Sequence, residues 1–420
     1  MTNNENKDRD TKQISGSNQY SLEKVRMPIA VYFLAFSIFI ICTAELLPMG
    51  LLPHIARDFD MDLSHTGLLI TVYALGVAIG GPLITAATGH IDRKKLLIGL
   101  LILFVGGALL SAITTDFNLL MVGRLLCSFS HGTLVGVSIV VVQRLAPAGK
   151  EGRAISYLTV GLTVATVLGV PVGTFIGSSF GWRMSFYVLA IAATICVVGM
   201  AWLVPVVRVG KSVGMVKQTR EIFRIKPLTA LLTTIFSSGG LFAGYTYIAP
   251  YLEEISGFSP KAVSPIMLAF GLGSAIGNIV SGKLADKGLM QTLLGSLIAM
   301  IITMTSFSFF GHVPILAILF SFLWGLTGFA IVTPLNMLVL RKAGDAADLA
   351  ASLNISAFNI GSAIGAALGG VAIHTALGLR AAPLSGAVTG LVGILFAFSL
   401  IWMDRQSSLK QPINQKSNNT

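Results

Sequence analysis

Charged residues are scarce in this 420-residue chain, and their scarcity excludes a soluble globular domain. Asp, Glu, Lys and Arg together make up 11% of the residues, against about 25% in soluble proteins, and 54% of the residues are hydrophobic. The mean hydropathy of the chain is +0.80. This composition indicates a membrane protein that crosses the bilayer many times.

The sequence also lacks the residue patterns of disulfide, metal and nucleotide sites. Its three cysteines, Cys42, Cys127 and Cys196, lie in apolar segments outside any Cys-x-x-Cys sequence, so we interpret them as small packing residues. The six histidines form no His-Glu-x-x-His sequence, and Gly-x-x-x-x-Gly-Lys-Ser/Thr does not occur. We therefore expect no cofactor, no use of ATP and no enzyme activity.

What the chain has in abundance is long apolar runs. A membrane-spanning helix needs about 20 mostly apolar residues, and twelve segments meet this length. The predicted spans are 28–52, 66–88, 96–115, 118–143, 154–179, 184–206, 228–251, 263–284, 290–311, 314–340, 351–376 and 382–403.

The basic residues indicate how these spans are oriented. With the N-terminus inside, 24 of the 29 Lys and Arg residues fall in inner segments and four in outer ones, while Arg124 lies within a span. Short cytoplasmic loops carry such an excess. We therefore expect both termini in the cytoplasm of a bacterial inner-membrane protein. The net charge of +11 is explained by this topology, and we expect no nucleic-acid partner.

The longest interior hydrophilic stretch, 207–227, follows the sixth span and divides the chain into two halves. We expect a six-helix bundle over 28–206, a cytoplasmic linker over 207–227 and a second six-helix bundle over 228–404. Residues 1–27 are polar with mixed charge, which is typical of a disordered tail, and 405–420 form the other cytoplasmic tail.

Matching charged turns support this division into halves. The second span is followed by Asp92-Arg93-Lys-Lys, and the eighth span, which holds the same place in the second half, runs into Gly282-Lys-Leu-Ala-Asp286-Lys-Gly. Two pseudo-symmetric halves predict a transporter with a cavity between them near the middle of the membrane.

At these residues the chain resembles the major facilitator superfamily. The stretch that begins at Gly282 is similar to the family's loop motif Gly-x-Leu-Ala-Asp-Arg-x-Gly. The first copy departs from that motif, with Gly89 where Asp is usual and Asp92 where Gly is usual. This pattern, and Glu45-x-x-x-x-Gly-Leu-Leu-Pro53 in the first span, resemble the arabinose-type, purine-base and chloramphenicol efflux subgroup.

Two further stretches extend the resemblance. Arg124, followed by His131-Gly, is similar to the Arg-containing motif of the family's fourth helix. The fifth span looks like the family's antiporter motif, with Ala165 where Gly is often found. Its small or helix-breaking residues are Gly161, Gly169, Pro171 and Gly173.

The resemblance covers about residues 28–404. It implies an all-α membrane protein of twelve transmembrane helices in two pseudo-symmetric six-helix bundles. Within that fold it implies the twelve-span drug:proton antiporter family.

Glu45 is the one acidic residue inside an apolar segment, where a carboxylate is costly and rare. From the helical rise we place Glu45 about 10 Å and Arg124 about 9 Å below the outer interface, with Tyr73 at a similar level. We expect Glu45 to bind a proton and to be balanced by Arg124 in part of the cycle, since burial favours the neutral acid and a guanidinium the charged one. The alternative is a static ion pair that fixes helix packing.

His131 lies two helical turns beyond Arg124 on the same face. It suits a proton relay or a substrate contact, and the alternative is a neutral histidine that bonds a neighbouring helix. For the glycines and Pro171 of the fifth span, we expect a bendable seam that gates the halves, against the alternative of ordinary close packing.

Asp92, Arg93 and Asp286 in the charged turns suit a latch between helix ends, although a carboxylate at such a turn is also a common helix cap. Aromatic and amide side chains deep in the spans suit a cavity for flat, weakly polar substrates, and each also suits simple packing. The predicted cavity residues are Tyr73, Tyr245, Trp324, Asn336, Asn354 and Asn359.

These features together predict a proton-coupled exporter of small organic molecules that works by alternating access, without a nucleotide. The expected partners are a small-molecule substrate, protons and membrane lipid, and we expect a monomer. Two alternatives remain open at this point. One is an exporter of purine bases, nucleosides or sugars, and the other is a facilitator or importer without proton coupling.

Overall fold

The computed structural model describes residues 27–409 except 89, 148, 207–223 and 345–346. Most of the predicted linker and nearly all of both predicted tails lie outside the described residues. The described part folds into helices joined by turns and contains no strand. Twelve of its helical segments are long and apolar enough to cross a membrane, which confirms the predicted all-α fold.

The elements run as follows along the chain. They are α2 (Ile29–Asp58), α3 (Leu63–Leu75), η1 (Gly76–Gly80), α4 (Gly81–Ala87), α5 (Arg93–Ile113), α6 (Phe117–Leu145), α7 (Glu151–Val164), η2 (Ala165–Gly169), α8 (Val170–Phe180), α9 (Trp182–Leu203), α11 (Ile225–Tyr245), α12 (Ile248–Glu254), α13 (Pro260–Lys287), α14 (Leu289–Phe310), α15 (Pro314–Phe329), α16 (Val332–Ala343), α17 (Ala347–Ala372), η4 (Gly378–Arg380) and α18 (Ala381–Leu409).

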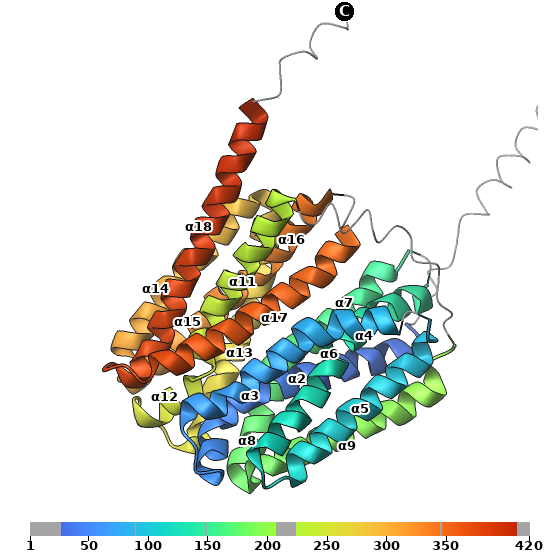
Figure 1. The fold of residues 1–420 in the computed structure, drawn as a ribbon, viewed down its shortest axis with the longest axis horizontal. Coiled ribbons are helices and arrows are strands. Elements are labelled where there is room, and N and C mark those ends of the chain that lie inside the picture. The colour runs from blue at the N-terminus through green and yellow to red at the C-terminus, as the bar shows by residue number, and fades with distance from the viewer. Residues whose placement is uncertain (1–26, 89, 148, 207–223, 345–346, 410–420) are drawn as a thin grey trace, which may run out of the picture.

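These helices form two bundles that lie side by side. The bundle from α2 to α9 is drawn in blue and green and the bundle from α11 to α18 in yellow to red (Figure 1). Because the number of spans is even, α2 begins and α18 ends on the same face of the molecule, here called the terminal face. The opposite face, where α2 ends, is called the Arg57 face.

Four predicted spans are interrupted, and the same physical cause applies to each. Proline has no N–H to donate to the carbonyl four residues earlier, so a regular helix fails there. Pro82 and Pro171 follow the π-helical segments η1 and η2, while Pro250 and Pro334 follow the breaks between α11 and α12 and between α15 and α16. The interruptions therefore fall where the sequence leaves a carbonyl without its donor.

Three hydrogen bonds join the bundles between the Arg57 face and the middle of the molecule. At the Arg57 face, Arg57 Nη2 lies 2.8 Å from Glu253 Oε2. Deeper in, the Ser264 hydroxyl donates to the Pro171 carbonyl at 2.7 Å. At mid-depth the hydroxyl of Ser274 donates to that of Thr166 at 3.4 Å.

Tyr247, in the turn after α11, also holds the bundles together near the Arg57 face. It is buried, and its hydroxyl donates to the Ala366 carbonyl on α17 at 3.1 Å. A Cβ atom on Gly67 of α3 would lie 2.3 Å from this hydroxyl oxygen, and one on Gly370 of α17 would lie 2.6 Å from it. Only glycine at these two positions allows α3 and α17 to close on the tyrosine.

Candidate functional site

A cavity of about 210 Å³ lies between the bundles, lined by helices of both. Helices α2 and α6 supply its ionisable side chains, which among the described residues are Cys42, Glu45 and His131. The facing bundle supplies amides and phenyl rings. The amides come from Asn278, Asn336, Asn354 and Asn359, and the rings from Phe242, Phe329 and Phe358.

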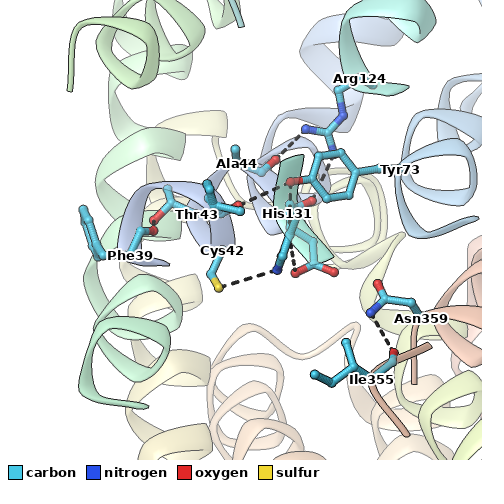
Figure 2. Close-up of polar contacts among 11 residues, drawn as sticks. Phe39, Cys42, Thr43, Ala44, Tyr73, Arg124, His131, Ile355 and Asn359 are labelled. Carbon is cyan, nitrogen blue, oxygen red and sulfur yellow. Dashed lines mark hydrogen bonds and ion pairs between the residues drawn. The ribbon is translucent and has the colours of Figure 1, made fainter. Parts of the chain in front are cut away.

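Glu45 and His131 meet at this cavity from neighbouring helices. The ring atom Nδ1 of His131 lies 3.8 Å from Glu45 Oε2, and the side chains are 9% and 21% exposed. On the other side of the ring, Nε2 lies 4.0 Å from the sulfur of Cys42 (Figure 2). The carboxylate is thus sheltered from bulk water and has a titratable imidazole beside it.

Tyr73 supports the imidazole from behind. Its hydroxyl lies 3.2 Å from His131 Nδ1 and 3.5 Å from the Ile41 carbonyl, and the two rings meet edge to face (Figure 2). The hydroxyl has one proton, so it can donate to the carbonyl only while His131 Nδ1 keeps its own hydrogen or makes no bond to it. Tyr73 therefore contacts the predicted proton site but does not line the cavity.

Arg124 is fully buried, and its guanidinium contacts the backbone of Glu45, not the carboxylate. Nη1 donates to the Ala44 carbonyl at 2.5 Å and Nη2 to the Glu45 carbonyl at 3.2 Å, and the guanidinium stacks 4.1 Å from the centre of the Tyr73 ring. Pro48 explains this preference, because it has no N–H to offer the carbonyl of Ala44 four residues before it. In this conformation the nearest titratable partner of the carboxylate is His131, and a Glu45–Arg124 ion pair elsewhere in the cycle stays a prediction.

Three of the predicted cavity residues line the cavity, all of them amides. Asn354 accepts from the Thr234 hydroxyl and donates to Asn336 Oδ1, each at 2.7 Å. Asn336 in turn donates to the Val332 carbonyl at 3.1 Å and is exposed. Asn359 is 5% exposed and donates to the Ile355 carbonyl at 3.0 Å, which leaves its Oδ1 buried without a partner.

The predicted cavity aromatics of the second half lie elsewhere. The ring of Tyr245 stacks on that of Phe270 at 4.2 Å, and Trp324 packs against Phe270 and Phe307. Both are fully buried within their own bundle and do not line the cavity. Packing, the alternative reading of these two residues, describes their place in this conformation.

Sequence reasoning missed Asn278, Cys42 and the three phenylalanines of the cavity wall. Asn278 had a usable signal, since an amide inside an apolar span is the same feature that identified Asn354 and Asn359. The phenylalanines had none, because 24 such residues are spread through the spans and most face lipid or a neighbouring helix. The sulfur of Cys42 was interpreted as packing alone, although it contacts His131.

The glycines of the fifth span face α2 within their own bundle. A Cβ atom on Gly161 would lie 2.4 Å from the Ala35 carbonyl, on Gly169 2.0 Å from the Thr43 hydroxyl and on Gly173 2.6 Å from Leu47. They allow close packing. The adjacent segment η2 contacts α13 of the other bundle, where a Cβ on Gly271 would lie 2.5 Å from the Thr166 carbonyl. A gating role for this span stays a prediction.

The charged turns differ from each other. Asp92 caps α5, accepting from the backbone N–H groups of Lys94 at 2.9 Å and Lys95 at 3.2 Å. Its Oδ2 atom and the Nη1 atom of Arg93 are buried without a partner among the described residues. Asp286, near the end of α13, is exposed. A latch at these turns stays a prediction, and the cap is what Asp92 forms here.

Two six-helix bundles with a polar cavity between them define a membrane transporter. The family described as Major Facilitator Superfamily matches residues 34–352. The chain is also 38% identical over 389 residues to the inner membrane transport protein YdhP of Escherichia coli strain K12, covering 93% of this chain and 98% of that protein. It is 36% identical over 367 residues to the uncharacterized MFS-type transporter YtbD of Bacillus subtilis, covering 85% and 92%.

Solved structures share the fold at low sequence identity. A bacterial homologue of the human lysosomal transporter Spinster, in an inward-facing and unoccupied conformation, matches with a TM-score of 0.72 at 14% identity, covering 90% of this chain and 96% of that chain. A mutant of the nucleoside transporter NupG matches with a TM-score of 0.68 at 13% identity, covering 90% and 100%.

The chain therefore belongs to the major facilitator superfamily. It is a multi-pass transporter of the bacterial inner membrane and not an enzyme.

Proposed function

We propose that this transporter exports small organic molecules in exchange for protons, by alternating access of one cavity. The supporting observation is the position of Glu45, the one acidic residue among the described residues that line the cavity between the bundles. A carboxylate there can exchange its proton with whichever side of the membrane the cavity faces. One charge that crosses 100 mV is worth about 2.3 kcal/mol, enough to drive substrate against a gradient.

The partners of Glu45 suit reversible protonation. Arg124 directs its donors at backbone carbonyls, so the carboxylate is not neutralised by a permanent cation in this conformation. His131 is 3.8 Å away, hydrogen-bonded to Tyr73, and is suited to pass a proton to or from the carboxylate. Proton transfer between the two needs only a small approach of the side chains, and no other group.

The contacts between the bundles suit one end of an alternating-access cycle. With both termini in the cytoplasm, the Arg57 face is the outer face, and the Arg57–Glu253 pair and Tyr247 close it. Opening this face and closing the terminal face would carry the cavity from one side to the other. On this proposal the present conformation faces inward.

The test uses everted membrane vesicles that contain the full-length protein and acidify their interior. Adding a transported compound should dissipate the proton gradient in the wild type and leave it intact in Glu45→Gln, which should retain less than about a tenth of the coupled flux. Glu254→Gln, a matched change at an exposed position on α12, should behave like the wild type. Undiminished proton-linked flux in Glu45→Gln would contradict the proposal, provided both variants reach the membrane in equal amounts.

The compounds to test come from a growth screen. A deletion strain grown across antibiotics, purine analogues and sugars would identify which of these classes the protein removes from the cell. A compound that equilibrates in vesicles at the same rate with and without a proton gradient would favour an uncoupled facilitator.

A further inference from the structure

The cavity wall of the second bundle presents one hydrogen-bond donor and one acceptor whose orientations are set by the protein. The acceptor is Oδ1 of Asn359. Its Nδ2 donates to the Ile355 carbonyl at 3.0 Å, and since a carbonyl only accepts, the amide cannot turn over without opposing two oxygens. Oδ1 is then left buried, with no partner among the described residues (Figure 2).

The donor is the amide nitrogen of Asn278 on α13. The hydroxyl of Thr333 donates to Asn278 Oδ1 at 2.7 Å, which directs the NH₂ group of the amide away from α16. This nitrogen makes no hydrogen bond with the part of the chain that the structure describes. Asn336 and Asn354 differ from this pair, because each of them both donates and accepts within the bundle.

The rest of the lining limits the charge, shape and size of what can bind. Among the described residues it includes one carboxylate and no Lys or Arg, so an anionic substrate finds no compensating charge. Phe242 and Phe358 meet edge to face at 5.7 Å, and with Phe329 they offer apolar surface to a flat ring. The volume of about 210 Å³ is smaller than the roughly 300–1,000 Å³ typical of pockets for drug-sized ligands.

We propose that Asn278 and Asn359 select the substrate, and that it is a small, planar, uncharged compound with an N–H and a C=O group on one edge. Asn359 accepts from the N–H and Asn278 donates to the C=O, while the phenyl rings contact the faces of the ring. This inference rests on the proposed function only in taking the cavity as the transport site. It places substrate selection on the second bundle and proton binding, through Glu45, on the first.

The discriminating power of this arrangement comes from the unpaired oxygen of Asn359. A ligand without the N–H leaves that acceptor buried and unsatisfied, and sites of this kind reject such analogues far more strongly than apolar pockets reject a change in size. Removing the N–H from the ligand should therefore cost more affinity than adding a methyl group alone would.

The test measures binding to the purified full-length protein in detergent, without a proton gradient. The probes are carbostyril, a bicyclic aromatic lactam, its N-methyl derivative and quinaldate, a carboxylate of the same ring size. The wild type should bind carbostyril at least about tenfold more tightly than either of the others. Equal affinity for the lactam and its N-methyl derivative, preference for the carboxylate, or no binding of the lactam would overturn the proposal.

Variants locate the effect. Asn359→Leu should lose the preference for carbostyril over its N-methyl derivative, and Asn278→Leu should weaken carbostyril about tenfold. Asn118→Leu, at the exposed start of α6, is the matched control and should bind like the wild type. If either leucine variant melts at a lower temperature, Asn359→Thr and Asn278→Thr replace them. Lactam preference that survives both substitutions would also refute the proposal.

The binding assay and the vesicle assay fail separately. Lactam-selective binding that depends on Asn359, together with full coupled flux in Glu45→Gln, would remove the proton mechanism and keep the selection site. Loss of coupling in Glu45→Gln with no lactam preference would do the reverse.

Discussion

The guanidinium of Arg124 on α6 takes the place of a missing backbone donor on α2. Its Nη1 atom lies 2.5 Å from the carbonyl oxygen of Ala44, which in a regular helix would accept from residue 48, and that residue is proline. The second amino group bonds the next carbonyl, at Glu45. Arg124 therefore holds the backbone of the very residue whose carboxylate we propose to carry the proton.

This relationship predicts coupling between Arg124 and Pro48. Arg124→Leu leaves the Ala44 carbonyl buried without a donor and should lower the stability of the folded protein by about 1–3 kcal/mol. Pro48→Ala restores a backbone N–H, so adding it to Arg124→Leu should recover part of the loss. Thermal unfolding of the purified proteins in detergent measures both. Strictly additive changes in the double variant would show that the two residues do not share this carbonyl.

A second prediction concerns closure of the Arg57 face. Gly67→Ala places a methyl group 2.3 Å from the Tyr247 hydroxyl, so α3 must move away and the conformation open at this face should become more populated. Spin labels at Asp60→Cys and Lys261→Cys, exposed positions on the two bundles at this face, should report longer distances.

Two matched variants control this experiment. Gly99→Ala changes another helical glycine, but its Cβ would meet nothing within 4 Å, so the measured distances should not change. Tyr247→Leu added to Gly67→Ala removes the clashing hydroxyl and should return them toward the wild-type values. Unchanged distances in Gly67→Ala would mean that Tyr247 does not hold this face closed.

The third prediction concerns pH and the start of α3. Asp62 lies in the turn between two spans and caps α3, accepting at 2.8 Å from both the backbone N–H and the ring of His65. The backbone hydrogen bond, followed by that of the ring, holds the pKa of this carboxyl below its usual value. A depressed folded-state pKa stabilises the fold above the unfolded pKa of about 4 and ceases to do so as the pH falls through the folded value.

Asp62→Ala should therefore cost about 1 kcal/mol at neutral pH, the usual cost of losing an N-cap. The melting temperatures of wild type and variant should converge as the pH falls below about 4. Asp62→Asn keeps a capping oxygen without the charge and should lose less stability at neutral pH, with little dependence on pH. A difference between wild type and Asp62→Ala that is constant with pH would contradict this account.

The twelve spans and the importance of Glu45 could be predicted from the sequence because each rests on a local signal. A run of about 20 apolar residues has few alternatives to a membrane helix, and an acid within such a run stands out in one dimension. The breaks before Pro250 and Pro334 were also visible as prolines, although only the coordinates show that the helices restart after them.

The partners of these residues could not be predicted in the same way. A buried guanidinium satisfies its donors with a carboxylate or with carbonyls, and the position of Arg124 beside the Pro48 gap decides between them. Tyr245 and Trp324 lie as deep in their helices as the cavity amides do, yet their faces turn toward Phe270 in the same bundle. Depth follows from counting residues, whereas the direction of a side chain depends on how the helices rotate against each other.

The π-helical segment η2 has a consequence for how the fifth span can vary. It accommodates one residue more than a regular helix would over the same length, and Gly173 and Thr174 follow it in the chain. Deleting a single residue between Ala165 and Gly169 would restore an ordinary helix and turn everything beyond it by about 100°. Gly173 would then no longer face Leu47, and the Pro171 carbonyl would point away from Ser264. We would expect a chain shortened by one residue there to reach the membrane with its outer closure misaligned, while shortening a loop by one residue would leave the bundles in register.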